Sequence, residues 1–148
     1  MKRVFLLTSI FFAAAFFSQS LNAQTEAQRV DLCTQRTQGA TFQASYIIQF
    51  PAQVAGERPQ TFRQGIALTR GNRYRFTFCN DDALMGEAVV QIMFNGREIA
   101  TNYNSATGAI AHTLDFDCTA TGAFAIIIRF NDGQEGSAVC IVSHVRTL

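Results

Sequence analysis

The residues of this chain with the most distinctive chemistry are its four cysteines, Cys33, Cys79, Cys118 and Cys140. In a small exported domain, an even number of cysteines predicts disulfides, here two. The alternative is a metal site, because thiolates also bind zinc. The sequence has no Cys-x-x-Cys pair, however, and only His112 and His144 could supplement the thiolates. We therefore expect two disulfides, provided that the chain is exported.

Oxygen-bearing side chains gather in three segments that we expect to be loops. They are Asn80, Asp81, Asp82 and Glu87 in the first segment, Asn102 and Asn104 in the second, and Asn131, Asp132 and Glu135 in the third. Hard oxygen ligands that converge from neighbouring loops suit calcium, for which Asp81, Asp82 and Asp132 are the candidate ligands. The alternative is that these residues simply occupy solvated turns. No Asp-x-Asp-x-Asp-Gly calcium loop is present.

The residues that could catalyse a reaction form no recognisable catalytic motif. Asp115 and Asp117 could be a glycosidase pair, but such pairs normally come from opposing elements of a cleft, and a polar strand face explains them better. His112 shares the parity of neighbouring apolar residues, which places it at the rim of the core. No Gly-x-Ser-x-Gly elbow exists, and Lys2 is the only lysine. We therefore predict no catalytic residues and no enzyme activity.

The N-terminal residues indicate export. Met1-Lys2-Arg3 is basic, residues 4–17 are apolar, and residues 18–23 are small and polar. This is the order of a secretory signal peptide, and we predict cleavage after Ala23. A membrane anchor is the alternative, but the uncharged stretch is short for a bilayer span and lacks a basic stop. We expect a signal peptide (1–23), a polar lead-in (24–38) and one domain (39–148), located in the periplasm or outside the cell.

Composition limits the choice of partner. The 148 residues are 48% apolar and 16% charged, as in an ordinary globular domain. Without the signal peptide, ten arginines face eleven acidic residues. A net charge so close to zero removes the usual electrostatic argument for nucleic-acid binding. A protein or a carbohydrate therefore remains as the candidate partner.

Eight short segments with strand periodicity follow the lead-in, and no segment has a helical period. They span residues 41–50, 62–68, 73–78, 90–94, 97–103, 110–116, 124–130 and 139–145. Between two of them, Asn95-Gly96 is the preferred dipeptide of a type I′ hairpin. Two packed antiparallel sheets bury eight such apolar stripes most economically. Because the core tryptophan of immunoglobulin domains is absent and the early connections are long, we predict an all-β, eight-stranded antiparallel β-sandwich of jelly-roll type.

The second half of the chain resembles a known family. Its segments are Gly-Asn-Arg-Tyr-Arg-Phe at 71–76, Ile-Ala-Thr-Asn-Tyr-Asn at 99–104 and Thr-Gly-Ala-Phe-Ala-Ile at 121–126. They are similar to segments of the bacterial pre-peptidase C-terminal domain, as in small exported Bacteroidetes-type proteins. Phe124 stands where family members often have tyrosine, which leaves its packing role intact. The resemblance implies a jelly-roll domain that is itself non-catalytic.

A jelly-roll strand order predicts which cysteines pair. Its third and eighth strands are antiparallel neighbours, so Cys79, which ends one, should meet Cys140, which begins the other. Cys33 and Cys118 would then pair at the opposite end of the sandwich. By this argument, a Cys33–Cys79 pair would contradict the strand order.

The same order gathers alternate loops at one end of the sandwich, where we predict the binding surface. Its candidate residues are Asn80, Asp81, Asp82, Tyr103, Asn131, Asp132 and Glu135. Loops held by a rigid sandwich are the usual place for recognition. Tyr103 lies between two asparagines, a combination that suits contacts with either a sugar or a peptide.

These observations predict an exported, non-catalytic β-sandwich that acts as a binding or interaction module. Its partner is a carbohydrate or another protein, and the sequence does not choose between them. One alternative is a structural accessory subunit of a bacterial envelope complex, which would carry a large apolar surface patch. The other is a small secreted hydrolase, with a cleft that places His112 or His144 near a nucleophile. We expect no cofactor other than calcium.

Overall fold

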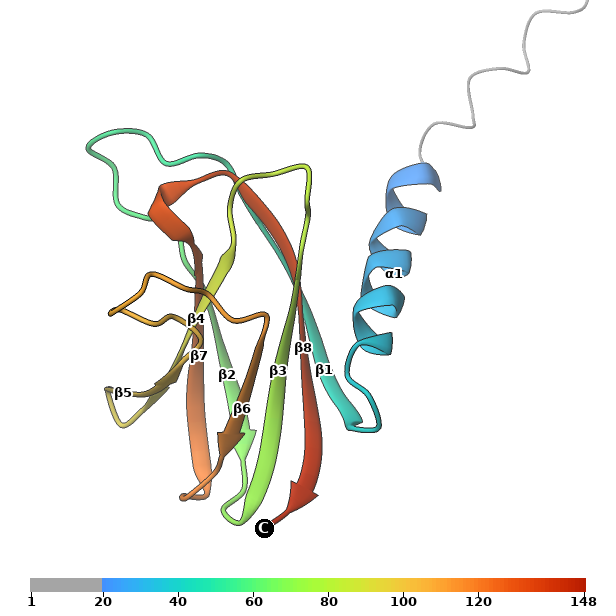
Figure 1. Cartoon of the computed structure of the whole chain (residues 1–148), viewed down its shortest axis with the longest axis vertical. Helices are drawn as coiled ribbons and strands as arrows, with labels where there is room; N and C mark the ends of the chain where they lie inside the picture. The colour runs from blue at the N-terminus through green and yellow to red at the C-terminus, as the bar shows by residue number, and fades with distance from the viewer. Residues whose placement is uncertain (1–19) are drawn as a thin grey trace, which may run out of the picture.

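The computed structural model of the protein describes residues 20–148 (Figure 1). Most of the predicted signal peptide, residues 1–19, lies outside the described residues, and its cleavage stays a prediction. The described residues form a helix, eight strands and a short 3-10 helix. In chain order these are α1 (Ser20–Gln35), β1 (Thr41–Phe50), β2 (Phe62–Leu68), β3 (Asn72–Asn80), β4 (Ala88–Phe94), β5 (Arg97–Thr101), β6 (Thr113–Asp117), β7 (Gly122–Phe130), η1 (Asn131–Gly133) and β8 (Gly136–Thr147).

The strands form two antiparallel sheets of four strands each, as the sequence predicts. The neighbour order is β1-β8-β3-β6 in sheet A and β2-β7-β4-β5 in sheet B. The predicted adjacency of the third and eighth strands is confirmed, because β3 pairs antiparallel with β8. Alternate residues of each strand face the space between the sheets. The largest fully buried side chains of this core include Phe76, Phe78, Ile48, Leu68, Ile92, Ile126 and Ile128.

The hairpin between β4 and β5 has the predicted turn. Asn95 and Gly96 have φ values of 50° and 76°, and the ladder starts with Phe94 opposite Arg97. Positive φ at both central residues is the property of a type I′ turn, for which Asn-Gly is preferred.

The lead-in is helical, although its sequence has no helical period. Helix α1 lies against the outer face of sheet A (Figure 1). Its alanine, glutamine, glutamate and arginine residues favour a helix. A helical period in the sequence requires a broad apolar stripe. Among the side chains of α1 described by the structure, those of residues 26–35, only Val30 and Cys33 pack into the apolar cluster on the sheet. No helix within residues 20–148 has the length and apolar character needed to cross a membrane.

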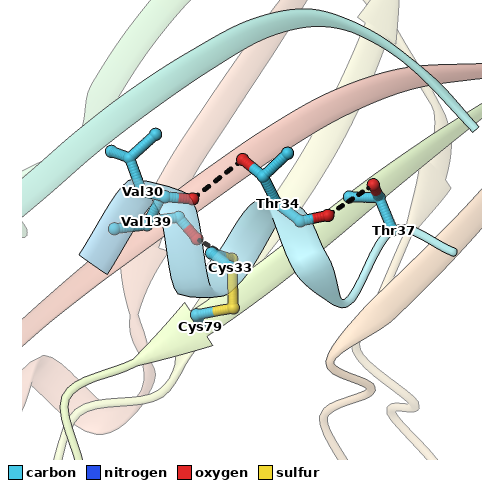
Figure 2. Close-up of a disulfide and its surroundings, with 6 residues drawn as sticks. All are labelled: Val30, Cys33, Thr34, Thr37, Cys79 and Val139. Carbon is cyan, nitrogen blue, oxygen red and sulfur yellow. Dashed lines mark hydrogen bonds between the residues drawn. A yellow bond between two sulfur atoms is a disulfide. The ribbon is translucent and has the colours of Figure 1, made fainter. Parts of the chain in front are cut away.

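A disulfide joins α1 to β3, between Cys33 and Cys79, whose Cα atoms are 5.8 Å apart (Figure 2). The predicted Cys79–Cys140 and Cys33–Cys118 pairs are therefore wrong. The register of β3 and β8 places Cys79 opposite Val139, and Cys140 opposite Phe78. Successive side chains on a strand point to opposite faces, so Cys79 faces α1 while Cys140 faces the core. The Cys33–Cys79 pair does not contradict the predicted strand order after all. Cys33 belongs to a helix on the outside of the sheet, so its bond to Cys79 does not depend on which strands are neighbours.

Cys118 and Cys140 are buried free thiols, so the prediction of two disulfides is also wrong. The backbone N–H of Cys118 donates to the carbonyl oxygen of Asn72 (2.9 Å), whereas Cys140 lies opposite Phe78. Asn72 and Phe78 are six residues apart on β3, which separates the two cysteines by about 20 Å at the rise of a β-strand. A disulfide requires Cα atoms within about 7 Å. The two thiols cannot be joined without unfolding the sheet.

Candidate functional site

Four loops connect the strands at one end of the sandwich, which we call the loop end. They are the β1–β2 loop (51–61), the β3–β4 loop (81–87), the β5–β6 loop (102–112) and the β7–β8 loop (131–135). Backbone bonds join three of them: Gln53 N–H donates to Gly133 O (2.8 Å), and Gly86 N–H donates to Glu135 O (2.8 Å). The β5–β6 loop is attached through His112 O, which accepts from Phe78 N–H (2.8 Å). Figure 1 shows the β1–β2, β3–β4 and β7–β8 loops at the end opposite the C-terminus.

Two glycines permit the close approach of these loops. A Cβ atom at Gly86 would lie 2.7 Å from the carbonyl oxygen of Glu135. At Gly133, a Cβ atom would lie 2.6 Å from Oε1 of Gln53, and φ is 64°, a conformation that favours glycine. At Gly86 the loops therefore pack backbone against backbone, and any larger residue there would push them apart.

The predicted asparagines build the loops through bonds to the backbone. Asn102, which is 6% exposed, accepts from Val90 N–H at Oδ1 (2.8 Å) and donates from Nδ2 to Ala88 O (3.0 Å) and Ala111 O (2.8 Å). The other three also accept backbone N–H groups at Oδ1: Asn80 from Ala88 (3.0 Å), Asn104 from Ala106 (2.9 Å) and Asn131 from Glu87 (2.7 Å). These amides therefore have structural roles, which the loop signals in the sequence did not distinguish from binding roles.

An open depression at the loop end collects part of the predicted acidic set. It is lined by Arg36, Asn80, Asp81, Asp82, Leu84, Gly86, Glu87 and His112. Asp132 and Glu135 are exposed on the β7–β8 loop and do not line it. Arg36 was not among the predicted site residues, because the polar lead-in (24–38) showed no helical period and the helix that ends beside Arg36 was not expected.

The structure gives no geometric support to the calcium hypothesis. Among the residues that the structure describes, no three His, Cys, Asp or Glu side chains come together as a metal ion would require. Oδ1 of Asp81 instead accepts the N–H of Ala83 (3.0 Å) in a local turn. Calcium binding by Asp81, Asp82 and Asp132 stays a prediction. A rise in melting temperature with millimolar calcium that Asp82→Ala abolishes would support it.

Apolar side chains are also exposed at the loop end. Met85 on the β3–β4 loop is 78% exposed, and Val54 on the β1–β2 loop is 60% exposed. Tyr103 is 37% exposed and forms an isolated bridge with Ile110. The exposure of Tyr103 was predicted from the sequence, whereas that of Val54 and Met85 was not, because single apolar residues in loops carry no periodic signal.

Within the part of the chain that the structure describes, neither histidine side chain forms a hydrogen bond with a serine, threonine or cysteine side chain. His112 is exposed rather than at the rim of the core, because β6 begins after it and strand parity does not extend to it. His144 packs edge-on against Tyr74, with ring centroids 5.9 Å apart. Its Nε2 lies 3.0 Å from Oδ1 of Asn72. Neither arrangement resembles a nucleophile and its general base.

Asp115 and Asp117 are paired with arginines across the β3–β6 ladder. Nε and Nη2 of Arg75 donate to Asp115 (2.6 and 2.8 Å), and the same atoms of Arg73 donate to Asp117 (2.5 and 2.7 Å). The hydrogen bonds from these guanidinium groups lower the pKa of both carboxyl groups. A glycosidase acid needs a raised pKa, so these pairs form a charged strand face.

Comparison with known proteins identifies a similar fold but no family. No protein-family model matches this chain, and no curated protein matches it either. The resemblance to the pre-peptidase C-terminal domain therefore stays a prediction. A similar fold occurs in PliG of Aeromonas hydrophila, a periplasmic inhibitor of g-type lysozyme, with a TM-score of 0.51 and 14% sequence identity. The match covers 72% of this chain and 89% of PliG, and at this identity it concerns the fold alone.

Proposed function

We propose that this chain is an exported, non-catalytic β-sandwich module that binds another protein through its loop end. The observation that carries the proposal is the exposure of Val54 and Met85 on loops that backbone hydrogen bonds hold together. Apolar anchors within a polar rim are the usual anatomy of a protein interface. Loops that are already ordered lose little conformational freedom on binding.

The charge of the loop end indicates the chemistry of the partner. The β1–β2, β3–β4 and β7–β8 loops together carry six carboxylates and one arginine. Neither of the two ion pairs of the described residues involves these carboxylates. These negative charges complement a protein with a basic surface. Their electrostatic field would steer and orient such a partner as it approaches.

The similarity to PliG supports export and a protein partner. PliG is a periplasmic inhibitor protein, so one example of this sandwich acts outside the cytoplasm by binding an enzyme. The predicted signal peptide points to the same compartment. A g-type lysozyme is therefore the first partner to test.

A carbohydrate partner has less support from the geometry. Sugar sites combine an exposed aromatic ring with free hydrogen-bonding groups. Tyr103 is flanked by Asn102 and Asn104, but the oxygen atoms of both amides already accept backbone N–H groups. A hydrolase has less support still, because the residues that line the depression beside His112 include no serine, threonine or cysteine.

The proposal is tested by cross-linking in the cell envelope of the source organism. A photo-activatable residue replaces Met85 at the loop end or, as the control, Ile99, an exposed residue of β5 (43%) outside the loop end. We expect position 85 to cross-link to one protein with a basic surface and position 99 to give none. Equal cross-linking at both positions, or none at 85, would contradict the proposal.

A purified g-type lysozyme provides a second measurement. We expect calorimetry to show tight binding of this lysozyme. The double variant Met85→Ser, Val54→Ser should lower the affinity by at least about tenfold, because a few anchor residues contribute most of the affinity of an interface. Ile99→Ser should bind as the wild type does. Absence of binding to this lysozyme would exclude the lysozyme as partner, and the cross-linked protein would identify another.

A further inference from the structure

The attachment of α1 to the sandwich depends on few noncovalent contacts. A surface helix normally buries a broad apolar stripe. Of the α1 side chains that the structure describes (26–35), only Val30 and Cys33 join Val139 and Ile141 in the apolar cluster on sheet A. Figure 2 shows Cys33 bonded to Cys79 of β3, with Val30 and Val139 beside it. Sγ of Cys33 lies 3.7 Å from the carbonyl oxygen of Val139, and as a disulfide sulfur it has no proton to donate.

Polar atoms of α1 and of the sheet face on which it lies are poorly satisfied. Three buried polar side-chain atoms of the described residues have no hydrogen-bond partner: Nη2 of Arg29, Oγ1 of Thr77 and Oγ of Ser143. Arg29 belongs to α1, and its Nη1 reaches Ser137 of β8 (3.0 Å). Thr77 and Ser143 alternate with core residues, so they lie on the outer face of sheet A, yet they are only 3% and 0% exposed. Unpaired buried polar groups weaken the contact that buries them.

From these observations we propose that α1 is a cover over sheet A that the Cys33–Cys79 disulfide holds closed. Reduction by a dithiol breaks the sulfur–sulfur bond. Each cysteine gains one electron and one proton, and the dithiol becomes a disulfide. Helix α1 then leaves the sheet, turning at Gln38 and Gly39, which both have positive φ. The uncovered face presents Val139 and Ile141, while the sandwich stays folded.

The sequence of α1 explains why it would not stay docked when reduced. Helix α1 has sixteen residues, of which twelve remain after the predicted cleavage behind Ala23. A helix of this length is only marginally stable in water without packing. The sandwich, by contrast, has its own core between the two sheets, and none of the described side chains of α1 (26–35) contributes to it. The cover is therefore open where thiols are kept reduced and closed in an oxidising compartment.

Pulsed alkylation tests this proposal on the full chain, because Cys118 and Cys140 are internal controls. The protein is treated with dithiothreitol under native conditions and exposed briefly to iodoacetamide, and each cysteine is then quantified by peptide mass spectrometry. We expect Cys33 and Cys79 to react at least about 100 times faster than Cys118 and Cys140, as segments that open locally do relative to a folded core. The helical circular dichroism signal should fall while the β-sheet signal remains.

Two other results would overturn the proposal. Protection of Cys33, which is 0% exposed in the closed form, would mean that α1 stays docked without the disulfide. Equal labelling of all four cysteines would mean that the sandwich itself needs the disulfide. The variant Cys33→Ser provides a second measurement without reductant. In this variant Cys79 should be alkylated while Cys118 and Cys140 stay protected, and protection of Cys79 would again count against the proposal.

Discussion

The side-chain amide of Asn102 donates a hydrogen bond to the backbone carbonyl of Ala88 at 3.0 Å. Its oxygen accepts the N–H of Val90, two residues further along the same strand. The side chain of Asn102 thus makes the hydrogen bonds that a neighbouring strand would otherwise make to the first residues of β4, at the point where β5 has ended. Its second donor bond, to Ala111 O, fixes the far side of the β5–β6 loop.

We expect Asn102→Ala to destabilise the protein strongly. The substitution removes the partner of a buried carbonyl oxygen (Ala88), of a buried N–H (Val90) and of the less buried carbonyl oxygen of Ala111. We expect a cost of roughly 2–4 kcal/mol in the free energy of unfolding. Asn104→Ala is the matched control, because that exposed side chain bonds only within its own turn. It should cost less than about 1 kcal/mol. Urea unfolding monitored by circular dichroism measures both, and equal losses would refute the assigned role of Asn102.

Gly86→Ala should force the loops of the loop end apart. The added Cβ would lie 2.7 Å from Glu135 O and 2.9 Å from the Cα of Gly136, both backbone atoms that cannot turn aside. We expect a loss of about 1–3 kcal/mol, as for other overpacked sites, together with weaker binding of the partner. Gly65→Ala on β2 meets no atom within 4 Å and should leave stability and binding unchanged. Thermal unfolding and the lysozyme titration distinguish the two variants.

Non-reducing peptide mapping should link Cys33 to Cys79 and recover Cys118 and Cys140 as free thiols. Burial raises the pKa of the Cys140 thiol, so it should react with iodoacetamide only after unfolding. The Cys33–Cys79 bond closes a long loop, which in the chain-entropy model stabilises the fold by about 4 kcal/mol. Finding Cys79 joined to Cys140 would falsify the register of β3 and β8.

Strand periodicity was sufficient to predict the sandwich. The inward residues of β7, such as Phe124 and Ile126, alternate strictly with outward ones, because burial on one side of a sheet has a period of two. The same parity could have excluded the Cys79–Cys140 pair, since Cys79 alternates with the core residue Phe78. Helix α1 was not predictable from periodicity, because a covalent bond takes the place of an apolar stripe.

The candidate surface was predictable in position but not in residue roles. Strand order alone gathers the loops, so residues such as Asp82 and Asn131 were placed at the correct end of the molecule. Whether a side chain binds a ligand or its own backbone depends on loop geometry at the level of single hydrogen bonds. Asn131 and Asn102 illustrate this limit, since both satisfy the backbone of a neighbouring segment.

The Arg75–Asp115 pair should make the stability of the protein depend on pH in the acid range. The hydrogen bond from Arg75 lowers the pKa of Asp115 in the folded protein, below the value of about 3.9 in the unfolded chain. The unfolded state therefore binds the proton more readily. The stabilisation is present above the unfolded pKa and is lost as the pH falls through the folded pKa.

A double-mutant cycle with Arg75→Ala and Asp115→Ala measures this contribution. Because both side chains are partly solvated, 25% and 36% exposed, the coupling free energy at pH 7 should be at most about 1 kcal/mol. Near pH 2 it should approach zero, since a protonated carboxyl group no longer attracts the guanidinium. The cycle isolates the pair from Arg73 and Asp117, which remain in every variant. A coupling that is the same at both pH values would show that Arg75 and Asp115 interact through packing rather than charge.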